Sequence, residues 1–70
     1  MIKYGEGLKY QREFHNLTQS ELARKTGIKQ QNISRWENDE SFPSIDFCVK
    51  LADFYGITLD ELVGRDSIGE

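Results

Sequence analysis

Two adjacent glutamines are followed by an asparagine, a serine and an arginine in the segment QQNISRWEN, residues 30–38. A glutamine amide can bond both N7 and N6 of adenine, an arginine guanidinium can bond O6 and N7 of guanine, and serine can bond either base. The segment could therefore read base pairs in DNA if these side chains share one face of a helix. An ordinary solvent-exposed face is the alternative, although such faces favour lysine and glutamate over paired glutamines.

Helical spacing separates an apolar side of this segment from a polar side. At about 100° per residue, Ile33 and Trp36 fall together and should point into the core. Trp36 could also stack on a base, but its position beside Ile33 favours the core. The polar side chains fall on the opposite side and on its flanks. The residues that we expect to read bases are Gln30, Gln31, Ser34 and Arg35.

The charge of the chain is unevenly distributed. A net charge of −3 argues against a nucleic-acid partner, because phosphate contacts usually leave a basic footprint. Residues 1–37, however, carry seven Lys or Arg against four Asp or Glu, which is +3, and residues 38–70 carry two against eight, which is −6. One end of the molecule can thus face an anion while the other end is repelled from it.

Helix start and stop signals predict five short helices and no strand, and hence an all-α fold. The first helix runs to about His15 and ends at Asn16, a residue that tolerates the left-handed conformation. The second starts at about Gln19, after the capping-box sequence Thr18-Gln-Ser-Glu21, and ends at Gly27. The polar segment described above, from about residue 30 to residue 37, forms the third helix.

The fourth helix follows a loop over residues 38–43 and is capped by Ser44. Gly56 ends it, and a second capping box, Thr58-Leu-Asp-Glu61, opens a short fifth helix. The residues that we expect on the core side of the fourth helix are Ile45, Cys48, Leu51, Ala52 and Tyr55.

Only one or two residues around Gly27 separate the second and third helices, so these helices must cross steeply. Ala23 suits such a close crossing because a larger side chain would not fit there, and Ile28 and Ile33 can fill the angle between the helices. The pattern indicates a helix-turn-helix. From the turn alone, any small helical bundle with a tight turn fits equally well.

The chain resembles the phage-repressor and Cro type of helix-turn-helix protein over roughly residues 5–64. The residues that carry the resemblance are LTQSELARKTGI (17–28), QQNISRWEN (30–38), Pro43-Ser44, Leu51-Ala52 and TLDEL (58–62). The resemblance implies a compact five-helix, lambda-repressor-like bundle with the helix-turn-helix in its second and third helices. It also implies a transcriptional regulator, which we expect to be a repressor that binds double-stranded DNA as a dimer on an inverted-repeat operator.

Phosphate contacts are expected beside the base-reading face. The resemblance implies one at Gln19, in the first turn of the second helix, where free N–H groups and the helix dipole attract anions. Lys29 stands where the family usually has a Ser or Thr cap, and we interpret it as a phosphate contact, with drift as the alternative. Asn32 and Asn38 complete the expected set. The two carboxylates after Asn38, where the family often has glycine and a basic residue, should weaken that contact.

Other residues are expected to be structural or to mediate association. In the family, the residues matching Arg12 and Glu37 form an ion pair that ties the first helix to the third. A weak homodimer through the acidic C-terminal half is expected, with apolar contacts around Ile57, Leu59 and Val63. Like charges would oppose this association in free solution.

Length and composition predict a single domain, residues 1–70, with a core over residues 5–64 and a short tail over residues 65–70. With so short a tail, no separate effector domain is expected. No apolar run approaches the roughly 20 residues of a membrane span, and no signal peptide is recognisable, so a cytoplasmic location without membrane contact is expected. A single cysteine, Cys48, and a single histidine, His15, support neither a disulfide nor a metal site, and no cofactor or small-molecule ligand is expected.

Four aromatic residues have no assigned role: Tyr10, Phe14, Phe47 and Phe54. They could pack the first helix onto the bundle or form a surface for a partner. They leave open a second hypothesis, a protein-interaction adaptor or antitoxin-like partner with the same fold. An enzyme is not expected, because the sequence lacks paired carboxylates at a pocket, a nucleophile with its base, and a phosphate loop.

Overall fold

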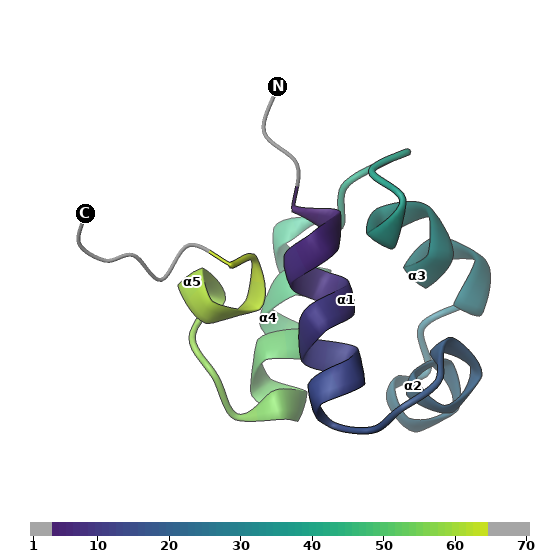
Figure 1. Cartoon of the computed structure of the whole chain (residues 1–70), viewed down its shortest axis with the longest axis horizontal. Helices are drawn as coiled ribbons and strands as arrows, with labels where there is room; N and C mark the ends of the chain where they lie inside the picture. Colours follow the sequence, from purple (N-terminus) through teal and green to yellow (C-terminus); the bar gives the residue numbers. More distant parts are fainter. Residues whose placement is uncertain (1–3, 65–70) are drawn as a thin grey trace.

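The computed structural model describes residues 4–64, so the tail expected over residues 65–70 lies outside the described part of the chain. The helices are α1 (Gly5–Phe14), α2 (Gln19–Thr26), α3 (Gln30–Glu37), α4 (Ile45–Tyr55) and α5 (Leu59–Leu62). The expected all-α fold with five helices is confirmed. In Figure 1, α2 and α3 lie on one side of α1, α5 lies on the other side, and α4 lies behind α1.

The capping residues set the helix boundaries that the sequence predicts. Thr18 accepts from the backbone N–H of Glu21 at 3.0 Å, and the Glu21 carboxylate accepts from the N–H of Thr18 at 2.8 Å. This backbone hydrogen bond holds the pKa of Glu21 below its ordinary value. Thr58 and Glu61 form the same reciprocal pair at the start of α5. These contacts satisfy N–H groups that the first turn of a helix leaves free.

Left-handed residues end three of the helices at the expected places. Asn16 has a φ of 59° after α1, Gly27 has a φ of 78° after α2, and Gly56 has a φ of 72° after α4. Apart from the glycine and its two chain neighbours, no residue in the described part of the chain has an atom within 4 Å of where a Cβ would be at Gly27 or Gly56. The requirement for glycine at these two positions is therefore conformational, not one of space.

One apolar core holds the helices together. Ile33 is 2% exposed, Trp36 is 6% exposed and Leu62 is fully buried. Leu62 anchors α5, which at four residues is too short to be stable without tertiary contacts. The remaining core residues are Leu8, Leu22, Ile28, Leu51, Ala52 and Tyr55.

The core side of α4 differs from the expected one at its first turn. Ile45 is 67% exposed, so its predicted place in the core was wrong. Phe47 packs there instead, with its ring centroid 5.3 Å from that of Trp36. Ile45 is the first residue of α4, and in this turn Phe47 makes the core contact in its place. Cys48 is half-buried against the core, and this burial raises the pKa of its thiol.

Two glycines let α1 pack closely against its neighbours. A Cβ at Gly5 would lie 2.7 Å from the carbonyl oxygen of Trp36, and one at Gly7 would lie 2.7 Å from the carbonyl carbon of Val63. The N–H of Gly5 also donates to Oδ1 of Asp39 at 2.9 Å. Backbone contact thus fixes the start of α1 against the end of α3 and against the end of α5.

Candidate nucleic-acid interface

The outer face of α3 carries the polar residues that the sequence singled out. Gln30, Gln31 and Arg35 are exposed, and Ser34 is half-buried. We call these four residues the polar face of α3. Asn32, expected on the flank, is half-buried as well. Because the apolar side of the same helix is anchored in the core, the rotation of the polar face about the helix axis is fixed.

The turn between α2 and α3 is fixed by hydrogen bonds as well as by Gly27. The buried hydroxyl of Thr26 donates to the carbonyl of Leu22 at 2.7 Å and accepts from the N–H of Ile28 at 3.2 Å. The N–H of Gly27 donates to the carbonyl of Ala23 at 2.8 Å. Ile28 is 3% exposed and fills the angle between the helices as expected. The two helices therefore form a rigid helix-turn-helix unit.

Glu37 links three helices through its carboxylate. Arg12 of α1 donates to it from Nε at 2.7 Å and from Nη2 at 3.0 Å, and Gln19 of α2 donates from Nε2 at 2.9 Å. Arg12 makes one further hydrogen bond, in which its Nη1 donates to the carbonyl of Leu17 at 2.7 Å. The ion pair expected between Arg12 and Glu37 is present, and the hydrogen bond with Glu37 raises the pKa of Arg12 above its ordinary value.

Gln19 has a partner that sequence reasoning missed. Its side-chain amide is oriented by Glu37, so a phosphate would meet its second N–H hydrogen or the backbone N–H groups at the start of α2. The spacing of Gln19 and Glu37 along the chain gives no sign of this bond. It exists because α2 and α3 cross at the helix-turn-helix.

Lys29 and Asn38 lie at the two ends of α3. Lys29 is exposed and occupies the N-cap position, where its side chain makes no capping bond. A lysine at the N-cap opposes the helix dipole and supplies no capping bond, so it does not stabilise α3. Asn38 is exposed and donates its backbone N–H to the carbonyl of Ser34 at 3.1 Å. Both side chains are therefore free to reach beyond the ends of the helix.

Charges near α3 support an anionic ligand more strongly than the net charge does. Arg24 and Lys25, in the last turn of α2, are exposed.

The two carboxylates after Asn38 differ in their surroundings. Asp39 takes a left-handed φ of 60° and its carboxylate accepts the N–H of Gly5, whereas Glu40 is exposed. Asp39 thus has a structural role that its position in the sequence did not suggest.

Comparison with known proteins places this geometry in a family. The model of a helix-turn-helix family matches residues 8–62. The chain belongs to the Cro/C1-type helix-turn-helix family. An HTH-type transcriptional regulator of Methanocaldococcus jannaschii is 40% identical over 55 residues, which are 79% of this chain and 83% of that relative. The phage repressor RstR of Vibrio cholerae is 38% identical over 64 residues, which are 91% of this chain and 57% of the repressor.

The fold of this helix-turn-helix protein also matches a solved structure. A transcriptional regulator from Listeria innocua superposes with a TM-score of 0.77 at 22% identity, over 96% of this chain and 63% of the other. Within residues 4–64, no group of three or more His, Cys, Asp or Glu side chains could hold a metal ion. Among these same residues, no helix combines the length and apolar character needed to cross a bilayer.

Proposed function

We propose that this helix-turn-helix protein is a transcriptional regulator that binds double-stranded DNA in a sequence-specific manner. The observation that carries the proposal is the polar face of α3, which is exposed on one side of a helix whose other side is locked into the core. A helix of this kind fits the major groove of B-DNA. Named relatives that are transcriptional regulators agree with this proposal and with a protein that is not an enzyme.

The polar face would divide its contacts among the edges of several bases. Gln30 and Gln31 would bond adenine, Arg35 would bond guanine, and Ser34 would contact either. Phosphates would be held at the ends of the two helices, by Gln19 at the start of α2 and by Lys29, Asn32 and Asn38 around α3. The exposed Arg24 and Lys25 lie at the end of α2 that leads into the turn and add positive charge there.

Repression from an inverted-repeat operator is the regulatory mode that we propose. One α3 spans only a few base pairs, whereas two copies about 34 Å apart can read successive major grooves on one side of the duplex. A bound dimer can exclude other proteins from the same DNA. A cytoplasmic location is part of this proposal.

Selection of bound fragments from random DNA tests the function directly. The expected result is one enriched sequence with two-fold symmetry, bound in a gel shift that weakens steeply as salt is raised. Failure to bind any DNA at low salt would overturn the proposal and favour the adaptor hypothesis. Binding of all fragments alike would limit the protein to non-specific contacts with phosphates.

A further inference from the structure

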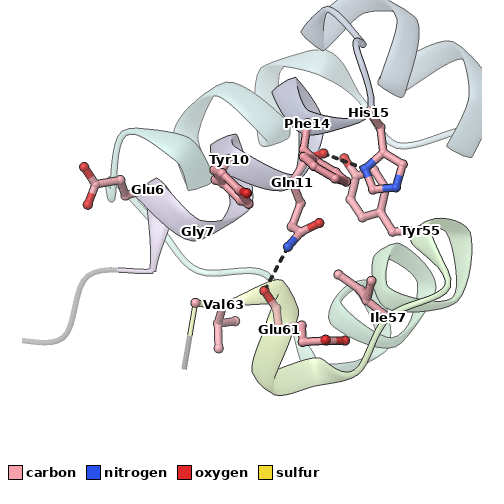
Figure 2. Close-up of a pocket in the computed structure, with 11 residues that line it drawn as sticks. Glu6, Gly7, Tyr10, Gln11, Phe14, His15, Tyr55, Ile57, Glu61 and Val63 are labelled. Carbon is pink, nitrogen blue, oxygen red and sulfur yellow. Dashed lines mark hydrogen bonds between the residues drawn. The ribbon is translucent and has the colours of Figure 1, made fainter. Parts of the chain in front are cut away.

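A groove of about 790 Å³ lies between α1 and the segment that contains α5. Its α1 wall is formed by Tyr10, Phe14 and His15, and its opposite wall by Ile57 and Val63 (Figure 2). Figure 1 shows that α3 and α5 lie on opposite sides of α1. The groove therefore faces away from the polar face of α3 and is not part of the proposed DNA interface.

The α1 wall is a row of three exposed aromatic rings, those of Tyr10, Phe14 and His15. Tyr10 is 59% exposed and Phe14 is 66% exposed, and their rings stack with centroids 5.9 Å apart. Phe14 meets His15 edge-on at 5.4 Å, and His15 lies 4.6 Å from the largely buried Tyr55. A single exposed apolar side chain is ordinary, whereas a contiguous patch beside a groove is typical of an interaction site.

The groove favours a positively charged ligand. Glu6 and Glu61 are among its lining residues, and no lysine or arginine of residues 4–64 lines it, so the formal charge around the groove is negative; the Glu61 carboxylate also accepts from the N–H of Thr58. Faces of aromatic rings attract cations as well. A ligand that fits both features carries a lysine or arginine next to apolar side chains.

A second copy of this chain is a poor match for the groove. The exposed basic residues of α2 and α3 lie on the part of the molecule that we assign to DNA. The other exposed lysines among residues 4–64, Lys9 and Lys50, each have one carboxylate three residues away and another four residues away on the same helix. Neither lysine presents a segment of net positive charge, so the part of the chain over residues 4–64 offers no matching segment and a different protein is favoured as the partner.

The conformation of the partner segment follows from the backbone of the groove. One wall is helix α1, whose N–H and C=O groups are mostly bonded within the helix, and on the opposite wall the N–H groups of Ile57 and Val63 already donate to the carbonyls of Ala52 and Leu59. An extended peptide would find few backbone partners there. A helical segment satisfies its own backbone and needs to offer only side chains.

We infer that this groove binds a short cationic helix of a partner protein. Apolar side chains of that helix lie between the aromatic row and Ile57, and its lysine or arginine is attracted by the negative charge of Glu6 and Glu61. The inference does not depend on DNA binding, since none of these residues belongs to the polar face of α3.

A displayed library of short helix-forming peptides, randomised along one face, is the probe for the groove. Peptides that bind the full chain should carry lysine or arginine between apolar residues at helical spacing. The double substitution Tyr10→Gln with Phe14→Gln should weaken their binding by about tenfold or more. Glu6→Gln should weaken it severalfold at low salt and less at high salt. In ¹⁵N spectra the peptides should shift amides of α1 and α5.

Matched controls separate the groove from general surface effects. Ile45→Gln removes an equally exposed apolar side chain outside the groove, Glu40→Gln removes an exposed carboxylate outside it, and neither should change peptide binding. The thermal midpoint of the double variant should stay near that of the wild type, because both aromatic side chains are exposed.

Three outcomes would overturn the inference. The first is a peptide selection in which the wild-type protein enriches no sequence that the double variant does not also enrich. The second is a set of peptides that bind wild type and double variant equally, or that shift amides of α2 and α3 instead. The third is a loss of self-association in the double variant without any peptide binding, which would assign the groove to a second copy.

Discussion

At the scale of single residues, Glu37 is a polar side chain that connects three helices. Its carboxylate accepts three hydrogen bonds, from donors on α1 and α2, while its own helix carries the polar face. The side chains of Arg12 and Glu37 are only 10% and 4% exposed. Removal of one partner leaves the other charge without compensation in a poorly solvated place.

Glu37→Ala should therefore lower the free energy of unfolding by about 3 to 5 kcal/mol. Gln19→Ala, which removes one neutral donor from the same carboxylate, should lower it by about 1 kcal/mol. Urea unfolding followed by circular dichroism measures both changes. A loss below about 1 kcal/mol for Glu37→Ala would mean that solvent compensates the guanidinium, contrary to the burial of the pair.

Tyr55 gives the fold a dependence on alkaline pH. Burial raises the pKa of Tyr55 to about 12 from the ordinary 10.0, and its hydroxyl has no hydrogen-bond partner within residues 4–64. The folded state holds this proton more tightly than the unfolded state, so the stabilisation is complete below pH 10 and is lost as pH rises toward 12.

Tyr55→Phe should abolish this part of the pH dependence. Between pH 10 and pH 12 the wild type should lose about 2 to 3 kcal/mol of unfolding free energy relative to the variant. Near neutral pH the two proteins should differ by about 1 kcal/mol or less, since the hydroxyl makes no bond that the variant would lose. If the unfolding free energies of the two proteins instead change in parallel between pH 10 and pH 12, the phenol is solvated in the folded state.

At the scale of elements, the helix boundaries were predictable because they depend on short-range signals. The two capping boxes and the left-handed residues Asn16, Gly27 and Gly56 act within a few positions along the chain. The polar face of α3 was predictable for the same reason, since helical period alone separates it from Ile33.

Contacts between distant residues were not predictable in this way. The bond from Gly5 to Asp39 and the bond from Gln19 to Glu37 exist only once the helices have crossed. Ile45 had the correct spacing for the core side of α4, but in the first turn of that helix Phe47 packs against Trp36 and Ile45 stays exposed. The aromatic groove likewise depends on how closely α1 approaches α5 at Gly7.

Lys29 allows a test in which stability and DNA binding change in opposite directions. Lys29→Ser supplies the missing cap of α3 and should raise the unfolding free energy by about 1 kcal/mol. The same substitution should weaken DNA binding on all sequences and make the dependence of log K on log salt shallower by about one. Thermal unfolding and gel shifts over a salt series measure the two effects. An unchanged salt slope would remove Lys29 from the phosphate contacts.

At the scale of the whole molecule, charge is distributed unevenly between the two sides of α1. Helices α2 and α3, which carry Arg24, Lys25 and Arg35, lie on one side of α1, and α5, which carries Asp60 and Glu61, lies on the other (Figure 1). Leu59 is 40% exposed on α5, whereas Ile57 and Val63 are half-buried against the core. Of the three apolar residues expected in a dimer contact, Leu59 is thus the most accessible.

Dimerisation through α5 should be weak in free protein and stronger in salt and on DNA, because like charges oppose it. Leu59→Lys should leave binding to a single half-site intact and abolish the extra affinity for an inverted repeat. Sedimentation of the free protein and of its complex gives the number of chains. One chain per complex, bound as tightly to a half-site as to the full repeat, would argue against a dimer.

Base reading by α3 is tested most directly by the affinities of wild type, Gln31→Ala and Arg35→Ala for the selected DNA site and all its single-base-pair variants. Each substitution should lower affinity for the selected site by about 1 to 3 kcal/mol and erase the preference at one base pair per half-site. Lys29→Ala is the control, with a similar loss on every sequence. If Gln31→Ala and Arg35→Ala also lose affinity equally on every sequence, α3 contacts only the DNA backbone and does not read bases.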